Sequence, residues 1–341
     1  MRENMPKPTS VLISLAIIVL GLVYFSEIIF PLIFATVGCL TLAPWVRSLK
    51  KKMPDILGVF IGLLTPMSVI ILLGFGYYLA ISGVISDLPD LSDQANEIVD
   101  DAGDSVESTI GMNVPSFQEM KRQSKDLLVS GSSILTDTFS AFSGLLSFLA
   151  LIPVYMFFIL RSEQNWIRFL QMRFDPYRAQ REMVKLKLCS EKLLAYYKGL
   201  SIIIIIVAIM NTAGLYLIGV PHSITLGTFS ALLIVIPYVG VFIGGVLPVI
   251  IAIVTGETYA TGLYVIGWYA LVQFLEGNII TPKLLGNMVD LNPLSLIVFM
   301  LIGGSVGGIL GIFLAAPILL VIKVYLSYSS GYRSWSSLLG N

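Results

Sequence analysis

The residue best placed to carry chemistry in this sequence is Glu276. It follows an apolar stretch at 259–275 and lies close to Gln273 and Asn278, so a carboxylate and two amides gather where that stretch ends. Ionisable groups at membrane depth are energetically costly and usually serve a function. The cluster therefore predicts a site for a polar substrate or an ion. The alternative is a helix-end carboxylate at the membrane surface.

A second polar group lies just before the next apolar stretch. Its members are Asp290, Asn287 and Asn292. A carboxylate with amide oxygens suits a hard cation or a hydroxylated substrate. Capping of the helix that begins near Pro293 is an equal alternative. Lys283 lies between the two groups, where it either pairs with Glu276 or marks a cytoplasmic loop.

Two long apolar stretches, at 224–254 and 293–326, are interrupted at their centres. Half of such a stretch covers about 20 Å, which is short of the roughly 30 Å hydrocarbon core. We predict two broken, re-entrant helical hairpins whose tips offer backbone groups to a ligand. The alternative is a set of conventional crossings, because glycines also serve close helix packing. The predicted tip residues are Pro237, Tyr238 and Gly240 in the first hairpin, and Gly303, Gly304, Ser305, Gly307 and Gly308 in the second.

One further amide, Asn211, lies in the middle of the predicted fifth span. An amide inside the membrane needs a hydrogen-bond partner, which a neighbouring helix can supply. We predict that Asn211 links two helices.

The composition is that of a membrane protein. Hydrophobic residues make up 56% of the chain and charged residues only 12%, whereas soluble domains carry about 25% charged residues. One histidine and two cysteines exclude a zinc site, a disulfide framework and a Cys/His pair. There is no Walker A motif. We expect no enzyme activity, catalytic residue, metal site or cofactor, with Na⁺ or H⁺ as the candidate coupling ion, and no nucleic-acid partner.

We predict an all-α polytopic membrane protein of about eight membrane segments with a small extramembrane insert. Its expected parts are transmembrane helices 1–3 in 1–85, an acidic helical insert at 86–138, a fourth helix at 139–160, a basic amphipathic segment at 161–198, a transport region at 199–326 and a tail at 327–341. The transport region should comprise a span, a hairpin, a second span and a second hairpin.

The distribution of charge predicts the orientation. The basic loop at 47–52 and the segment 161–198, with nine basic and four acidic residues, should be cytoplasmic. The insert at 86–138 carries eleven acidic and three basic residues and should lie outside, either as a solvated face or as a collector of cations. Both termini are then cytoplasmic. The two hairpins would enter the membrane from opposite sides, as in an inverted repeat.

Several short motifs occur in a fixed order from 236 to 317. They are Ile236-Pro237-Tyr238-Val239-Gly240, Gly244-Gly245 with Pro248, Glu276-Gly277-Asn278, Thr281-Pro282-Lys283-Leu284-Leu285-Gly286, Leu291-Asn292-Pro293-Leu294, Gly303-Gly304, Gly307 with Gly311, and Ala315-Ala316-Pro317. In these motifs, and in its layout over nearly the whole chain, the sequence resembles the AI-2E family of bacterial transporters. Val241 departs from the pattern, since the family often has proline there.

The resemblance implies a multi-pass transporter of the bacterial inner membrane that forms a homo-oligomer, with a pentamer as one candidate. The family's proposed substrates are autoinducer-2 or related small molecules for some members and sodium and protons for others. Our leading hypothesis is a secondary transporter that exports a small polar molecule by alternating access. The alternatives are a sodium(cation)/proton antiporter centred on Glu276 and Asp290, and a membrane scaffold or channel-like oligomer without coupled transport.

Overall fold

The structure is a computed structural model that describes residues 24–68, 151–237, 239–256, 260–285, 291–329 and 333–340, together with residues 21, 71 and 74. Every regular element within these ranges is a helix. Most of the predicted first span, the acidic insert at 86–138 and most of the predicted fourth span lie outside the described residues. The chain divides into two compact units, one comprising 1–66, 145–196 and 287–341 and the other 67–144 and 197–286.

Four of the described helices are long and apolar enough to cross a membrane. They are Ser26–Lys50, Pro176–Ile218, Ala260–Leu284 and Leu310–Ser327. Large apolar side chains on them face outward; Ile209 is 64% exposed and Leu263 is 69% exposed. Exposed apolar surface of this extent is rare on soluble monomers and marks contact with lipid or a partner. These helices confirm a helical membrane protein, while the total of eight segments stays a prediction.

The first unit is built on α2 (Ser26–Lys50) and two short helices, Asp55–Ser68 and Leu151–Arg161. Apolar side chains from all three form one buried cluster: Ala35, Cys39, Ala43, Val46, Val59, Leu63, Ile152, Met156 and Leu160. At its edge, the Lys50 Nζ donates to the Leu160 carbonyl at 2.9 Å. Arg47 forms an ion pair with Glu163 at 2.6 Å. The helices are thus joined by apolar packing inside and by charge at one end.

The basic segment forms α5 (Glu163–Arg173) and the first half of the long helix α6 (Pro176–Ile218). No residue of α5 is buried, and its aromatic residues Trp166 and Phe169 are exposed. The C-terminal segment of this unit contains α11 (Pro293–Ser327) and the short helix α12 (Arg333–Leu338). α11 packs on α2, where Phe34 and Phe313 stack with ring centroids 5.6 Å apart.

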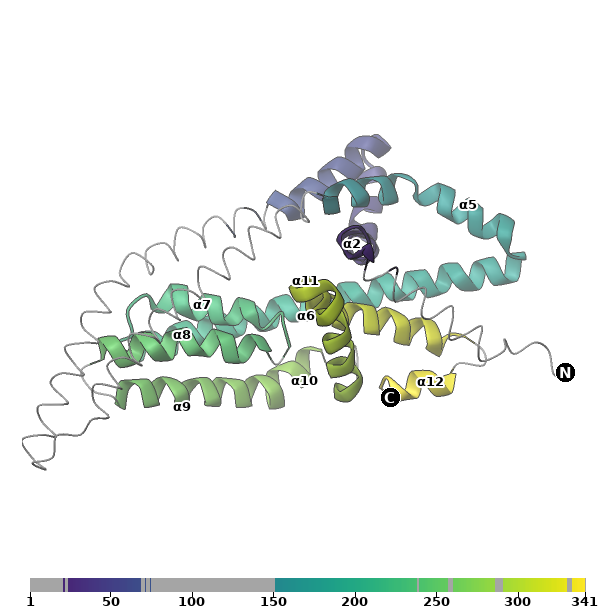
Figure 1. Ribbon diagram of the computed structural model, residues 1–341. Helices are drawn as coiled ribbons and strands as arrows, with labels where there is room; N and C mark the ends of the chain where they lie inside the picture. The colour runs from purple at the N-terminus through teal and green to yellow at the C-terminus, as the bar shows by residue number, and fades with distance from the viewer. Residues whose placement is uncertain are drawn as a thin grey trace, which may run out of the picture. The chain divides into compact units, whose positions relative to one another are not determined.

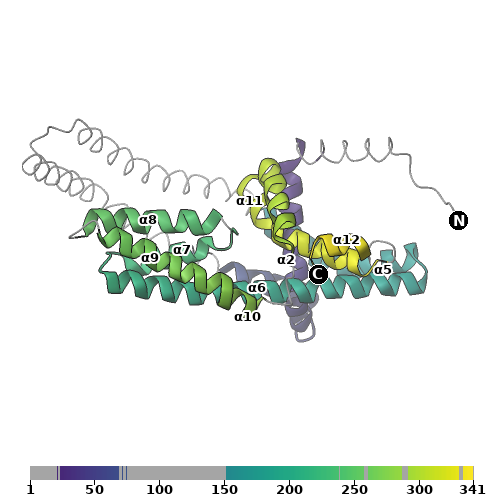
Figure 2. The same cartoon turned by 90° about the horizontal axis from the view of Figure 1, so that it is seen from below.

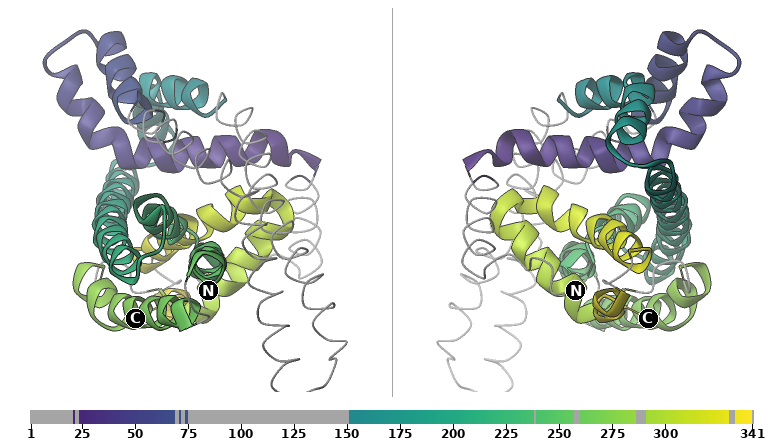
Figure 3. Two further views of the ribbon diagram at one scale, coloured as in Figure 1. Left: turned by 90° about the vertical axis from the view of Figure 1, so that its left-hand side faces the viewer. Right: turned by 90° about the vertical axis from the view of Figure 1, so that its right-hand side faces the viewer.

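α11 folds back on itself at Gly308, as Figure 3 shows in yellow-green. Gly308 has φ 56° and ψ −140°, a backbone conformation that residues with a Cβ rarely adopt. Beyond this point Gly311 comes back against Gly303: a Cβ on Gly303 would lie 2.4 Å from the Gly311 carbonyl oxygen. In a straight helix, residues eight apart are about 12 Å apart. The second interrupted stretch is therefore a helical hairpin, and its return to one membrane face stays a prediction.

The second unit contains the end of α6 followed by α7 (Ser223–Leu233), α8 (Val239–Thr255) and α9 (Ala260–Leu275). These helices lie side by side in Figures 1 and 2. Their facing sides form two apolar clusters: Leu215, Val220, Leu226, Phe229, Leu247, Ile251, Ala252 and Val265 in one, and Ile203, Val207, Ala231 and Val272 in the other. Close packing of these apolar side chains holds the four helices together.

α7 and α8 form the first helical hairpin. Gly240 lies against the backbone of Leu233, and Gly244 lies against Ser230, so the two helices run in opposite directions at close range. A Cβ on Gly244 would come within 2.8 Å of the Ser230 Cα. At 1.5 Å per residue α7 is about 16 Å long and α8 about 25 Å, both short of the hydrocarbon thickness. α7 and α8 thus form a helical hairpin with unequal arms, and its return to one membrane face stays a prediction.

Candidate functional site

Glu276 lies inside a helix, where it starts a widened turn. α9 continues through a π-helical segment, η1 (Glu276–Ile280), into α10 (Thr281–Leu284), giving one apolar helix from Ala260 to Leu284. The helix therefore continues beyond residue 275, where the apolar stretch ends. Pro282 supplies the physical reason, since it has no N–H for the carbonyl four residues back and its ring would clash with it. The helix widens instead, and the Thr281 N–H donates to the Glu276 carbonyl, five residues back.

The Glu276 carboxylate is half-buried and hydrogen-bonded by both of its oxygens. Gln273 Nε2 donates to one oxygen at 3.0 Å, and Thr281 Oγ1 donates to the other. A carboxylate offers about four acceptor positions, so acceptor capacity remains for a cation or for a donor from a substrate. Asn278 is exposed and donates to the Phe274 carbonyl of its own helix. The structure thus brings Gln273 together with Glu276 and places Asn278 apart from them.

Thr281 was not predicted as a site residue, although it begins the motif Thr281-Pro282-Lys283-Leu284-Leu285-Gly286. In a regular α-helix, positions five apart differ by about 140° around the axis, so Thr281 would point away from Glu276. Only the π-helical register, in which residues i and i+5 are hydrogen-bonded, brings them to one side. π-Helical turns within α-helices occur frequently at functional sites. Pro282, the residue after Thr281, is the feature of the sequence that could have indicated the π-helical turn.

Of the second predicted group, the structure describes Asn292 alone. Asn292 caps α11, since its side chain accepts from the Leu294 N–H at 2.9 Å. Its backbone N–H donates to the Leu339 carbonyl at 2.7 Å, which ties the start of α11 to the end of the chain. The capping alternative is therefore correct for Asn292. Asp290, Asn287 and Tyr238 lie outside the described residues.

The positively charged candidate near the site is Lys283. It is exposed on α10, and within the described parts of the chain no ion pair joins it to Glu276. The described residues also contain no group of three or more His, Cys, Asp or Glu side chains that could hold a metal ion.

The predicted tip residues that the structure describes differ in backbone conformation. Pro237 lies in the turn between α7 and α8, but Gly240 belongs to the first turn of α8. In α11 only Gly308 departs from helical geometry. The other predicted tip residues, Gly303, Gly304, Ser305 and Gly307, are helical and belong to the arm that leads to the reversal at Gly308. They allow close packing instead: Gly303 meets Gly311, and a Cβ on Gly307 would lie 2.4 Å from the Phe30 ring.

A buried polar cluster joins three helices of the second unit. Asn211 Nδ2 on α6 and the Tyr269 hydroxyl on α9 each donate to Ser230 Oγ on α7, both at 3.0 Å. Ser230 in turn donates to the Gly227 carbonyl at 3.0 Å. Asn211 therefore links helices, as predicted. Its Oδ1 is buried and has no hydrogen-bond partner among the described residues.

The sequence is similar to a family of known proteins. The family described as AI-2E family transporter matches residues 12–331. The protein YueF of Bacillus subtilis (strain 168) is 29% identical over 317 residues, covering 89% of this chain and 85% of YueF. The AI-2 transport protein TqsA of Escherichia coli (strain K12) is 24% identical over 334 residues, covering 96% of this chain and 93% of TqsA. PerM of the same strain is 25% identical, covering 88% of this chain and 87% of PerM.

Proposed function

Since the chain belongs to the AI-2E family of transporters, we propose that it moves a small polar molecule across the membrane as a secondary transporter. The family is one of transporters and permeases rather than enzymes. Because TqsA is named for AI-2 transport, autoinducer-2 and similar small oxygen-rich metabolites are the first substrates to test, with export as the expected direction. The proposed setting is the bacterial inner membrane, with both termini cytoplasmic and several copies, five being the first number to test, in one assembly.

The observation that carries the proposal is the Glu276 carboxylate in a helix of membrane-spanning length. Gln273 and Thr281 orient it, and its remaining acceptor positions suit hydroxyl groups of a substrate. A polar substrate can replace water at such a group without leaving the carboxylate unpaired. The π-helical turn supports the same role, because its backbone is not held in the regular α-helical pattern.

The two helical hairpins support an alternating-access mechanism. Each hairpin has arms close to or below the thickness of the hydrocarbon core, and each turns on residues that leave backbone groups outside the helical pattern. We propose that the first hairpin enters from outside and the second from the cytoplasm. Their movements would then expose the binding site to one side of the membrane at a time.

A cation/proton antiporter is the second candidate, and Glu276 also favours it. A carboxylate that loses and gains a proton can alternate between binding Na⁺ and binding H⁺, with Thr281 and Gln273 supplying neutral oxygens nearby. This candidate needs no organic substrate. The two functions therefore predict different fluxes from the same residue.

The test is flux through the full-length protein in proteoliposomes. Labelled metabolites, including autoinducer-2, are followed with wild type, Glu276→Gln and the matched control Glu191→Gln, whose carboxylate is exposed on α6 beside Lys187. We expect saturable flux in wild type and the control. Flux should fall roughly 10- to 100-fold in Glu276→Gln, from the loss of a hydrogen bond to a charged group. Sodium-dependent proton movement that disappears in Glu276→Gln would indicate the antiporter, and passive ion leak without saturation would indicate a channel-like assembly.

A further inference from the structure

The basic half of α6 runs along the second arm of α11 in the opposite direction, since Arg181 contacts Tyr328 and Cys189 contacts the Val321 carbonyl. Arg181 Nη2 donates to the Tyr328 carbonyl and Lys185 Nζ donates to Ser329 Oγ, each at 3.0 Å. Both partners on the α11 side come directly after Ser327, where the apolar helix Leu310–Ser327 ends. This junction therefore lies where the chain changes from lipid-compatible to water-compatible sequence.

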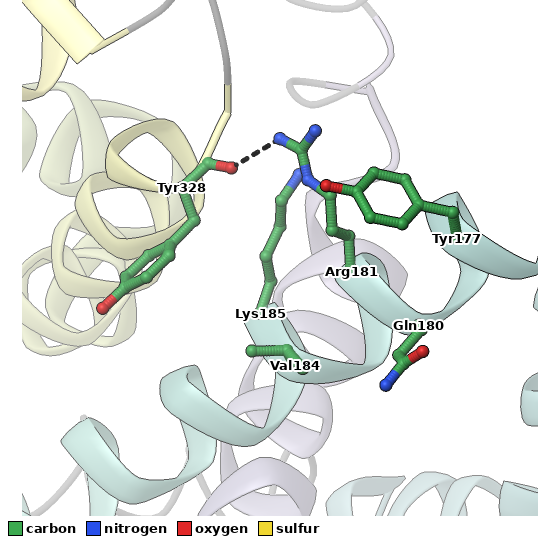
Figure 4. A pocket seen from close by; sticks show the side chains of 6 residues that line it. All are labelled: Tyr177, Gln180, Arg181, Val184, Lys185 and Tyr328. Carbon is green, nitrogen blue, oxygen red and sulfur yellow. Dashed lines mark hydrogen bonds between the residues drawn. The ribbon is translucent and has the colours of Figure 1, made fainter.

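A pocket of about 290 Å³ opens at this junction (Figure 4). Its lining combines two cations, an amide, an aliphatic side chain and two tyrosines: Arg181, Lys185, Gln180, Val184, Tyr177 and Tyr328. No carboxylate belongs to this lining. The pocket is therefore positive in charge and apolar at its margin.

The charge of Arg181 is the one available to a ligand. Lys185 is buried, and its ammonium group is paired with Glu182 at 2.8 Å. Arg181 forms no ion pair with a carboxylate in the described portion of the chain. It donates one hydrogen bond to the Tyr328 carbonyl, and its charge acts on Glu182, the next residue of α6, without direct contact. A guanidinium has five N–H donors in a planar fork that fits phosphate oxygens. Several donors of Arg181 therefore remain for an anion in the pocket.

The apolar side chains at the margin of the pocket favour a lipid over a dissolved anion as its ligand. Tyr177 is 72% exposed and Tyr328 is 52% exposed, and both border the pocket. Exposed tyrosines at the end of an apolar helix are typical of the membrane–water interface. The preceding helix α5 buries none of its residues and exposes Trp166 and Phe169, as expected of a helix that lies on a membrane surface.

We propose that this pocket binds the headgroup of an anionic phospholipid. Arg181 holds the phosphate, Gln180 supplies amide hydrogen bonds, and Tyr177, Val184 and Tyr328 contact the glycerol and the first acyl carbons. Lys185 positions the pocket by joining α6 to the end of α11 and adds positive potential. A lipid bound here would anchor the basic half of α6 and the end of α11 at one membrane surface.

The test measures lipid binding to the purified full-length protein by native mass spectrometry in detergent. Phosphatidylglycerol and phosphatidylcholine are compared for wild type, Arg181→Gln and Arg178→Gln. Arg178 is a matched control because it lies on the same helix, is exposed, pairs with Asp175 and does not line the pocket. We expect preference for phosphatidylglycerol in wild type and Arg178→Gln. Arg181→Gln should weaken this binding about fivefold or more, because one basic residue contributes about 1 kcal/mol to the attraction of anionic lipid.

Two outcomes would overturn the proposal. Equal weakening by both arginine substitutions would mean a diffuse attraction of the basic segment to anionic lipid. Displacement of phosphatidylglycerol by millimolar inorganic phosphate would mean a site for a dissolved anion. Thermal unfolding of each variant without added lipid checks that Arg181→Gln is folded, and Arg181→Lys provides a second variant that keeps the charge but removes the planar fork. That variant should bind with intermediate affinity.

Discussion

The hairpin in α11 makes a strong prediction at Gly311. A Cβ at this position would lie 1.9 Å from the carbonyl oxygen of Gly303, whereas real Cβ contacts are essentially never below 3.0 Å. The two arms must therefore separate by at least about 1 Å in Gly311→Ala, the difference between these two distances. The oxygen belongs to the backbone, so it cannot rotate away as a side chain could.

The expected size of the effect follows from two opposing terms. Alanine in a helix is favoured over glycine by about 1 kcal/mol. Overpacking costs about 1–3 kcal/mol, and contact with a backbone atom belongs to the upper part of this range. The net loss is therefore about 1–2 kcal/mol, which corresponds to a fall in melting temperature of roughly 1–3 °C for a chain of 341 residues.

Thermal unfolding in detergent, followed by tryptophan fluorescence, measures this change. Gly267→Ala on α9 is the matched control, because no heavy atom lies within 4 Å of its added Cβ. The control should melt at the wild-type temperature or above. If Gly311→Ala also melts at the wild-type temperature, the two arms of α11 do not meet at these glycines and the hairpin geometry is refuted.

Three further predictions follow from polar contacts. Ser230→Ala removes the acceptor of two buried donors and should cost about 1–3 kcal/mol in the free energy of unfolding, measured by thermal melting. Thr281→Val keeps the shape but removes the hydroxyl from the site carboxylate, so it should reduce flux or raise KM in proteoliposomes without lowering the melting temperature. Glu182 lies in the charged half of α6; burial alone would raise its pKa, but hydrogen bonds from Lys185 and Tyr325 outweigh this and hold the pKa below its ordinary 4.5. Its contribution to stability is thus present above pH 4.5 and lost as the pH falls through the lower folded value, and Glu182→Gln should flatten this part of the melting temperature–pH curve.

Each of these changes has a control on the same chain. Ser201→Ala removes a hydroxyl that only bonds its own helix, and Thr255→Val does the same on α8. Glu191→Gln removes an exposed carboxylate from α6. Equal effects in the members of any pair would show that the named contact has no special role.

The sequence contained enough information for the membrane class, both helical hairpins and the pairing of Gln273 with Glu276. Apolar stretches and their interruptions are local properties, and residues three apart meet on any α-helix. Thr281 was not predictable in this way, because its approach to Glu276 depends on a change of helical register. The pairing of Gly303 with Gly311 was equally hidden, since it requires the exact position of the reversal at Gly308.

The polar cluster on α7 shows a related limit. The need of Asn211 for a partner is evident from its place in an apolar stretch, and the structure supplies that partner. Which hydroxyl accepts the hydrogen bond from Asn211 depends on how α6, α7 and α9 pack against one another. Ser230 and Tyr269 were therefore found only in the structure.

The hydrogen bonds around Ser230 also have a direction, and it restricts how protons can travel. Tyr269 donates to Ser230, and Ser230 donates to the carbonyl of Gly227. A relay that passes protons by successive hops requires every member to accept at one end and donate at the other, and a backbone carbonyl has no proton to pass on. In this arrangement the chain of hydroxyls ends at a backbone carbonyl, which is a poor terminus for a proton relay. An exchanger of protons for another ion needs a group that binds and releases a proton, and the carboxylate of Glu276 is a group of that kind, whereas the Ser230 cluster contains none.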